Sequence, residues 1–173
     1  MRVLTERPGI PGKTDWRWAC FRVAVDSLKA YFDFDPKRKL DLEQLDRLIR
    51  KGAPTLKRHF HPGTLPSEAG MRFNMIGYGK FRYANKSGKS TDWPVGGVAL
   101  QKNYISVYFA INKDNAPITR PYAGKLGELR MGQNNFSFEK FSDRNIAALS
   151  SLFAQAASLF KSDPDNAIRS MQS

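Results

Sequence analysis

Cysteine, histidine and long apolar runs are all scarce in this sequence of 173 residues. Its one cysteine, Cys20, cannot form an internal disulfide, which suits a reducing compartment. No apolar run approaches the roughly 20 residues that a membrane-spanning helix needs. The N-terminal residues also lack the apolar stretch of a secretory signal. These absences predict a cytoplasmic protein without a membrane span.

Acidic residues are also few, because 16 Asp and Glu stand against 28 Lys and Arg, for a net charge of +12. The imbalance is strongest in residues 71–140, which hold 11 basic and 4 acidic residues, whereas residues 141–173 hold 3 of each. Such a surface attracts phosphates, nucleic acid, anionic membranes or acidic proteins through fields that salt screens. The alternative is a charge spread evenly over the surface that serves solubility.

The remaining composition is typical of a folded domain. Hydrophobic residues make up 41% of the chain and aromatic residues 12%, and the length suits one domain with its own core. Residues 1–14 are rich in proline and glycine and predict a flexible arm. Residues 162–173 predict a polar C-terminal tail. We therefore expect a single domain over residues 15–161.

Four segments have apolar residues at the three- and four-residue spacing that indicates a helix. Asp35 and Pro36 supply an N-cap and a first helical residue, and Gly52 suits a left-handed end of the same helix. Ser142 and Asp143 supply another cap. The predicted helices span residues 15–32, 36–51, 122–129 and 143–160.

Between these helices, prolines in residues 53–70 predict a loop, and period-two alternation after it predicts strands. Turns are expected at residues 85–90 and 101–103. We expect an α+β fold, with an antiparallel sheet of about five strands and N-terminal and C-terminal helices packed on one face. The predicted strands span residues 71–75, 80–84, 95–100, 104–111 and 135–138.

Several short motifs follow one another at family-like spacing over roughly residues 24–160. They are Ala53-Pro54, Ile76-Gly77-Tyr78-Gly79-Lys80-Phe81, Val98-Ala99-Leu100, Lys102-Asn103-Tyr104-Ile105, Leu126-Gly127 and Gly132. In these residues the chain resembles the YdhG-like family of small bacterial domains. The resemblance implies a compact α+β domain without an established enzyme activity. Some members are described as frataxin-like intracellular iron chaperones, which makes iron delivery an alternative function.

Two features differ from what the resemblance implies for iron handling. Family members often carry a cysteine in the strand that here reads Asn134-Asn135-Phe136. Frataxin-type iron binding also uses an acidic helix face, whereas this chain is strongly basic.

Candidate metal ligands are few. His59 and His61 would share one face of an extended segment, either as half of a transition-metal site or as surface histidines. Cys20 lies among apolar residues and is interpreted as a buried structural thiol. The acids between residues 33 and 46 are interpreted as a solvated helix face. We therefore predict no metal site, no cofactor and no catalytic residues.

The candidate ligand surface begins at a glycine-rich motif, residues 77–80. Its glycines would let a phosphate approach the backbone closely, although a β-bulge or a sharp bend requires glycine as well. Nearby tyrosines would offer stacking faces and basic residues would contact phosphates, unless the tyrosines border the core and the lysines occupy turns. The predicted strip, as we call these ligand-binding residues, consists of Gly77, Tyr78, Gly79, Lys80, Arg82, Tyr83, Lys102, Tyr104 and Tyr108.

These observations together favour a non-enzymatic binding or accessory domain. Its basic, aromatic-rich surface would take an anionic ligand or an acidic protein partner. A nucleic-acid-binding protein is an alternative beside the iron chaperone. The sequence leaves the identity of the ligand and the oligomeric state open.

Overall fold

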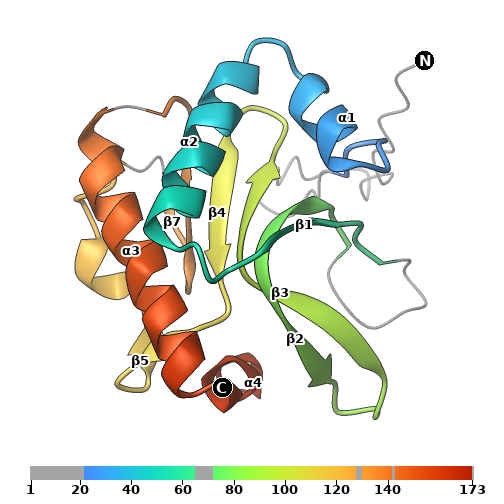
Figure 1. The fold of residues 1–173 in the computed structure, drawn as a ribbon, viewed down its shortest axis with the longest axis vertical. Coiled ribbons are helices and arrows are strands. Elements are labelled where there is room, and N and C mark those ends of the chain that lie inside the picture. Colours follow the sequence, from blue (N-terminus) through green and yellow to red (C-terminus); the bar gives the residue numbers. More distant parts are fainter. Residues whose placement is uncertain (1–21, 65–71, 128–129, 142, 173) are drawn as a thin grey trace, which may run out of the picture.

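The chain is built on a six-stranded antiparallel sheet, in a computed structural model that describes residues 22–64, 72–127, 130–141 and 143–172 (Figure 1). A small separate hairpin of β5 (Asn112–Lys113) and β6 (Ala116–Pro117) lies between β4 and β7 in the sequence. The strand order across the main sheet is β1 (Arg58–His61), β2 (Met75–Ala84), β3 (Ser90–Leu100), β4 (Ile105–Phe109), β8 (Asn135–Phe138) and β7 (Arg130–Met131).

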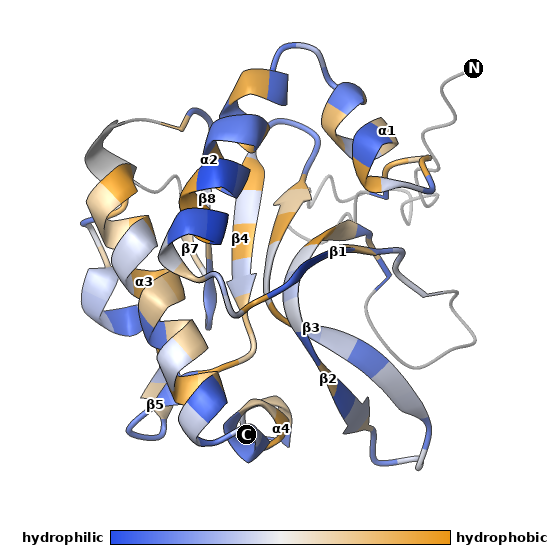
Figure 2. Cartoon of the chain, viewed as in Figure 1, coloured by the Kyte–Doolittle hydropathy of each residue, from blue (hydrophilic) through white to orange (hydrophobic). Residues whose placement is uncertain are grey.

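Two long helices, α2 (Lys39–Gly52) and α3 (Asp143–Ser162), pack against each other and cover one face of the sheet. The short α1 (Leu28–Asp33) precedes α2, and α4 (Asp165–Gln172) contacts α3, β2 and β5. The hydropathy colouring of Figure 2 shows hydrophilic residues over much of the outer side of α2. This architecture confirms the predicted α+β fold, an antiparallel sheet with helices on one face.

The core lies between the sheet and the two long helices. Leu42, Leu45 and Ile49 follow one another at three- and four-residue spacing on α2, and all three are fully buried. From α3, the Phe153 ring packs on Phe109 of β4 with ring centroids 4.8 Å apart. This spacing of apolar side chains, read from the sequence, therefore selects the faces of the helices that meet the sheet.

The opposite face of the sheet carries smaller and more polar side chains. Ser106 of β4 and Ser137 of β8 are buried neighbours whose hydroxyls lie 2.8 Å apart. Tyr108 lies on the same face and contacts the Phe73 ring at 5.3 Å. The predicted alternation in β4, with apolar residues on one side and Ser106 and Tyr108 on the other, is confirmed.

The first two predicted helices begin later than expected. Residues 22–27 are not helical, and α1 starts after Ser27, whose hydroxyl accepts a hydrogen bond from the Ala30 amide at 3.2 Å. The rest of that predicted helix, Cys20 and the arm of residues 1–14 lie outside the described residues. Helix α2 starts at Lys39 rather than residue 36, because the Asp35 carboxylate accepts from the Lys37 amide at 2.9 Å and closes a turn.

The C-terminal end of α2 also differs from the prediction, because Gly52 is its last helical residue and does not adopt a left-handed conformation. After it, the predicted loop of residues 53–70 contains the edge strand β1. Four residues of mixed polarity have no strand signature of their own, so their pairing with β2 makes them a strand.

Two predictions near the C-terminus are corrected as well. The helix predicted over residues 122–129 is only the 3₁₀ turn η2 (Arg120–Tyr122), with non-helical turns after it as far as the structure describes them. Residues 162–173 are not simply a polar tail, because they contain α4. The side-chain amide of Asn166 fixes this helix by bonding both the amide and the carbonyl of Asn112, at 3.0 and 2.8 Å.

Candidate anion-binding surface

Gly77 and Gly79 lie inside β2, which runs unbroken from Met75 to Ala84. The strand predicted over residues 80–84 is thus longer than expected, whereas the one predicted over residues 71–75 is wrong at residues 72–74, which are not strand. The His59 ring of β1 covers Gly77, where a Cβ atom would lie 2.5 Å from His59 Nε2. Gly79 has a φ of +71° and donates its amide hydrogen to the Lys57 carbonyl at 2.9 Å. Close approach and a bend therefore explain the glycines, and the Gly79 amide is not available to a phosphate.

Tyr78 is fully buried, so its predicted role as a stacking face on the surface is wrong. Its ring packs edge-on against Phe153 at 5.8 Å, and its hydroxyl donates to Asp46 Oδ1 at 2.8 Å. Asp46 Oδ2 accepts from Arg58 at 2.7 Å and from Arg50 at 3.0 Å. Burial and the adjacent Asp46 carboxylate raise the pKa of Tyr78 well above its usual value. Tyr78 therefore joins the sheet to α2 and α3.

The outer half of the β2–β3 hairpin has no other strand beside it. Strand β1 pairs with β2 only as far as Tyr78, and β4 pairs with β3 only from Gly96 onward. Residues 80–94, which we call the ribbon, therefore form a two-stranded extension of the sheet (Figure 1). The ribbon contains one acidic residue, Asp92, and four basic residues, which are Lys80, Arg82, Lys86 and Lys89.

The basic side chains of the ribbon are open to solvent. Those of Lys80 and Arg82 are 53% and 70% exposed, and both approach Asp92, at 4.0 and 3.3 Å. Lys86 is exposed at the tip, within the predicted turn of residues 85–90. Because exposed ion pairs contribute little and are screened by salt, one aspartate leaves the ribbon strongly positive.

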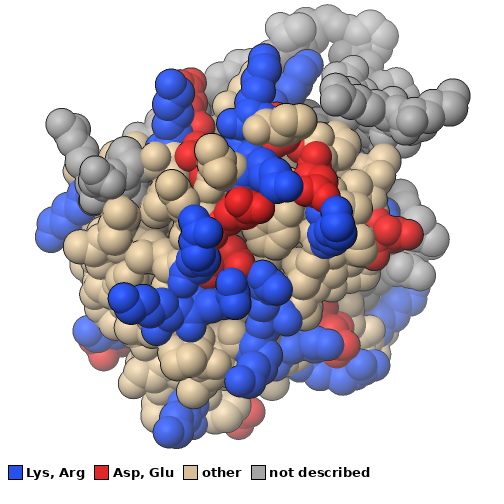
Figure 3. Space-filling model, turned by 45° about the horizontal axis from the view of Figure 1, so that its top comes forward, with Lys and Arg blue, Asp and Glu red and all other residues tan. Residues whose placement is uncertain are grey.

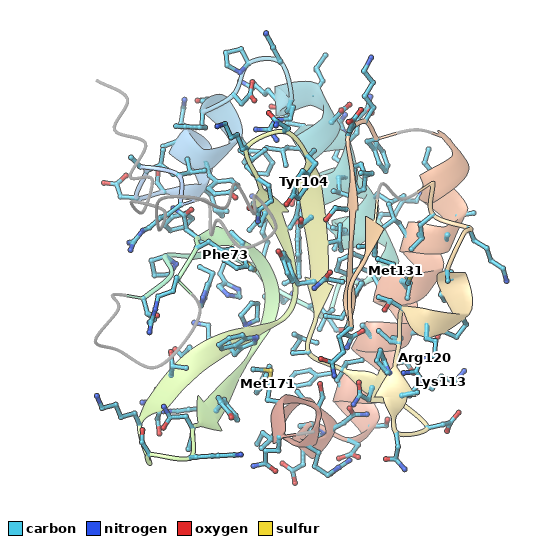
Figure 4. The ribbon with its side chains drawn as sticks, turned by 180° about the vertical axis from the view of Figure 1, so that it is seen from behind. Phe73, Tyr104, Lys113, Arg120, Met131 and Met171 are labelled. Atoms are coloured by element: carbon cyan, nitrogen blue, oxygen red, sulfur yellow. The ribbon has the colours of Figure 1, made fainter. Side chains whose placement is uncertain are left out.

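The aromatic side chains of the ribbon are engaged by the fold. Strand alternation places Phe81, Tyr83 and Trp93 on one face of the ribbon, and Lys80, Arg82 and Asp92 on the other. Tyr83 meets Trp93 edge to face at 6.4 Å, and both pack at the margin of the core. Met171 of α4 packs there as well, and Figure 4 shows it beside the ribbon. Tyr83 is therefore partly buried and not a free platform for a base.

Lys102 and Tyr104 lie in the β3–β4 turn, at the end of β3 opposite the ribbon; Figure 4 labels Tyr104 there. Arg38 holds this turn in place, because its Nη1 donates to the carbonyls of Gln101 and Tyr104 at 2.7 and 2.8 Å. The turn is thus anchored to the segment that precedes α2, far along the sheet from Lys80.

The predicted strip is therefore not one surface. The structure brings Lys80 and Arg82 together with Lys86 and Lys89 on the ribbon. Lys102 and Tyr104 lie at the other end of the sheet, and Tyr108 lies on the face away from the helices against Phe73. Gly77, Tyr78 and Gly79 are buried.

His59 and His61 share one face of β1, as the spacing predicted. His61 is 5% exposed, and its Nε2 has no hydrogen-bond partner. Burial, together with His59, lowers the pKa of His61 to about 4, and burial also lowers the pKa of His59. The described residues include no group of three or more metal-binding side chains, so within them the two histidines are at most half of a metal site.

The acids at the start of α2 have basic partners. Asp33 accepts hydrogen bonds from Lys29 and Lys39, both at 2.6 Å, and Asp35 accepts one from Arg38 at 2.7 Å. The hydrogen bonds from Lys29 and Lys39 lower the pKa of Asp33 to about 2. Asp33 and Asp35 form surface ion pairs, and nothing in their arrangement gathers them around a cation. Asp46 was also expected on a solvated helix face, and that interpretation is wrong, because Asp46 is buried.

Sequence reasoning missed a second basic surface, at the C-terminal end of α2 and the start of β1. Arg50 and Arg58 pair there with the buried Asp46. The three other basic residues of this surface, Arg47, Lys51 and Lys57, form no ion pair with the described residues. Figure 3, which tilts the top of the molecule forward, shows blue side chains gathered across the middle of the visible face. The sequence signal that could have revealed this surface is the spacing of Arg47, Arg50 and Lys51, which lie three and four residues apart and so share one side of α2. This α2–β1 patch consists of Arg47, Arg50, Lys51, Lys57 and Arg58.

Comparison with known proteins identifies no matching family model, characterised protein or solved structure. The resemblance to the YdhG-like family therefore stays a prediction. Among the described residues, none of the helices has both the length and the apolar character required to cross a bilayer.

Proposed function

We propose that this chain is a binding domain that uses the ribbon to bind a polyanion, with nucleic acid as the ligand class. The observation that carries the proposal is the extension of residues 80–94 beyond the sheet with four basic side chains and one acidic side chain. The ribbon is a small part of the chain but accounts for a net charge of +3 out of the total of +12.

The shape of the ribbon suits a nucleic acid. A two-stranded antiparallel ribbon fits the major groove of B-form DNA, and basic side chains along it reach phosphates. The tip is held in one conformation because the Asn85 carboxamide oxygen accepts hydrogen bonds from the amides of Ser87 and Lys89, each at 3.0 Å. A preformed tip loses less conformational entropy on binding than a disordered one.

The same geometry favours duplex over single-stranded ligands. Single-stranded binding relies on aromatic side chains that stack on bases. Here Tyr78 is buried, and Tyr83 and Trp93 pack at the margin of the core. We therefore expect a duplex to bind more tightly than a single strand of the same length.

The test is fluorescence anisotropy with a labelled 20-base-pair DNA duplex at several salt concentrations. Up to four phosphate contacts predict a slope of log K against log salt of about −3 to −4, hence roughly 100-fold weaker binding between 50 and 200 mM salt. The ribbon variant is the triple substitution Lys80→Gln, Arg82→Gln and Lys86→Gln. Its slope should fall to about −1, with binding at least 30-fold weaker at 50 mM salt.

A charge-matched control separates the ribbon from net charge. Lys113→Gln, Lys125→Gln and Lys161→Gln remove the same charge from exposed positions outside the ribbon. This control should weaken binding by less than about threefold, because it reduces the long-range attraction of the protein for DNA but removes no contact between the ribbon and a phosphate. Equal losses in both triple variants, or no binding by the unmodified protein at 50 mM salt, would contradict the proposal.

A further inference from the structure

A shallow groove of about 290 Å³ separates α2 from the start of α3 and the segment before it. Its floor is apolar and is formed by Leu48 of α2, Ile146 of α3, and Phe141 from the segment before α3. Gln44, Arg47 and Lys51 of α2 complete its lining. The groove lies on the helical side of the molecule, apart from the ribbon.

Of the exposed large hydrophobic side chains among the described residues, one lines this groove and the other lies on the same helix as its lining. Among the large hydrophobic side chains of the described residues, only those of Leu40 and Ile146 are exposed, with exposed fractions of 68% and 39%. Leu40 lies one turn before Gln44 on the same side of α2, so it extends the apolar surface beyond the end of the groove. The Phe141 amide, which donates to Asp41 Oδ2 at 3.4 Å, holds the segment before α3 beside this turn. From Leu40 to Lys51 this side of α2 is about 16 Å long, or three helical turns.

The described residues that line the groove include two basic side chains and no acidic one. Arg47 and Lys51 stand one turn apart on α2, and neither forms an ion pair with the described residues. Arg50, only one residue from Lys51, is instead paired with the buried Asp46 at 3.0 Å. Two cations beside an apolar floor match a ligand that offers carboxylates and apolar side chains together.

We propose that this groove docks an acidic amphipathic helix of a protein partner. The floor would take apolar side chains at helical spacing, and Arg47 and Lys51 would pair with Glu or Asp on the flank of that helix. A phosphate backbone would pair with Arg47 and Lys51 but would leave Leu40 and Ile146 exposed to water. If a second copy of this chain bound through the same face, Arg47 and Lys51 of the two copies would lie opposite each other, and their like charges would repel.

The probe is a fluorescein-labelled 16-residue helical peptide with Leu at positions i, i+4, i+7 and i+11 and Glu on one flank, with Ala and Gln elsewhere. Its anisotropy is measured against the full-length protein. We expect a dissociation constant of about 10–100 µM, and at least tenfold weaker binding of the same peptide with Lys in place of Glu. A peptide with Ser in place of Leu should not bind, because the floor then gains no apolar surface.

Surface variants then locate the site. Leu40→Ser and Ile146→Ser together should weaken the acidic peptide by at least fivefold, and both positions are exposed, so the fold should be retained. Arg47→Glu with Lys51→Glu should reverse the preference toward the Lys peptide. The matched control, Lys113→Glu with Lys125→Glu, should leave peptide binding within about twofold, as should the ribbon triple variant.

Three results would overturn the proposal. The acidic peptide could fail to bind below about 1 mM, or bind the Leu40→Ser/Ile146→Ser variant as tightly as the unmodified protein. Light scattering could show a dimer that becomes a monomer in that variant, which would assign the face to self-association. Because the ribbon triple variant reports on DNA and the groove variants report on the peptide, each proposal can fail without the other.

Discussion

Replacing Asp46 by alanine tests how α2 is held on the sheet. Asp46 is 3% exposed, and its carboxylate accepts hydrogen bonds from Tyr78, Arg58 and Arg50 at 2.8, 2.7 and 3.0 Å. The variant leaves the buried Tyr78 hydroxyl without an acceptor, at a cost of about 1–3 kcal/mol. The two arginine side chains, 33% and 49% exposed, can turn to water, so each adds less than about 1 kcal/mol.

The expected loss is therefore about 3 kcal/mol in the free energy of unfolding. For a chain of this length it corresponds to a fall of roughly 6–12 °C in the thermal midpoint. Urea unfolding followed by circular dichroism measures the free energy, and differential scanning calorimetry measures the midpoint. Glu43→Gln is the control on the same helix; its carboxylate lies 4.0 Å from the Lys39 ammonium at the surface, and its loss should not shift the midpoint measurably.

A double-mutant cycle isolates the buried bond. Tyr78→Phe removes one hydroxyl and should cost about 1–2 kcal/mol, since Asp46 keeps both arginines. The two substitutions combined should cost less than their sum by about 1–2 kcal/mol, because the Asp46 variant has already lost the bond. A loss below 1 kcal/mol for Asp46→Ala, or strict additivity in the cycle, would show that this carboxylate does not hold α2 in place.

Two further predictions concern the histidines of β1. The pKa of His61 falls from 6.5 to about 4 on folding, so only the unfolded chain takes up a proton between these values. The resulting stability is complete above pH 6.5 and is lost as pH falls toward 4, by about 3 kcal/mol in total. As the pH is lowered from 7 to 4, the urea midpoint of the unmodified protein should therefore fall more steeply than that of the His61→Gln variant. Parallel pH profiles for the two proteins would contradict this account. Gly77→Ala should cost about 1–3 kcal/mol because its Cβ would meet the His59 ring; His59→Ala should relieve much of this cost, and no relief would place the clash elsewhere.

The local patterns that succeeded were those with strong periodicity or clear turn chemistry. Strands β4 and β8 and the turn of residues 85–90 follow from alternation and from Asn85 and Gly88, which adopt the expected turn. Helices α2 and α3 follow from apolar stripes that a 3.6-residue repeat brings to one side. Such signals depend on residues close in the sequence, so one chain is enough to detect them.

The candidate site was harder to predict because it depends on residues distant in the sequence. Alternation along residues 75–84 cannot tell which tyrosine faces inward, and Tyr78 is buried because Asp46 of α2 and Phe153 of α3 lie over it. Lys80 and Lys102 were grouped by sequence proximity, yet β3 carries the chain from one end of the sheet to the other between them. The α2–β1 patch joins two elements across a turn and was not anticipated.

From the sequence alone one can determine the excess of positive charge, the α+β class and the inner faces of the long helices, since composition and periodicity are local properties. The tertiary structure alone decided that β1 is a strand, that residues 162–173 contain a helix, and that the basic residues separate into a ribbon, a turn and a patch. The physical reason is that burial and pairing arise from contacts between distant segments, which outweigh weak local preferences.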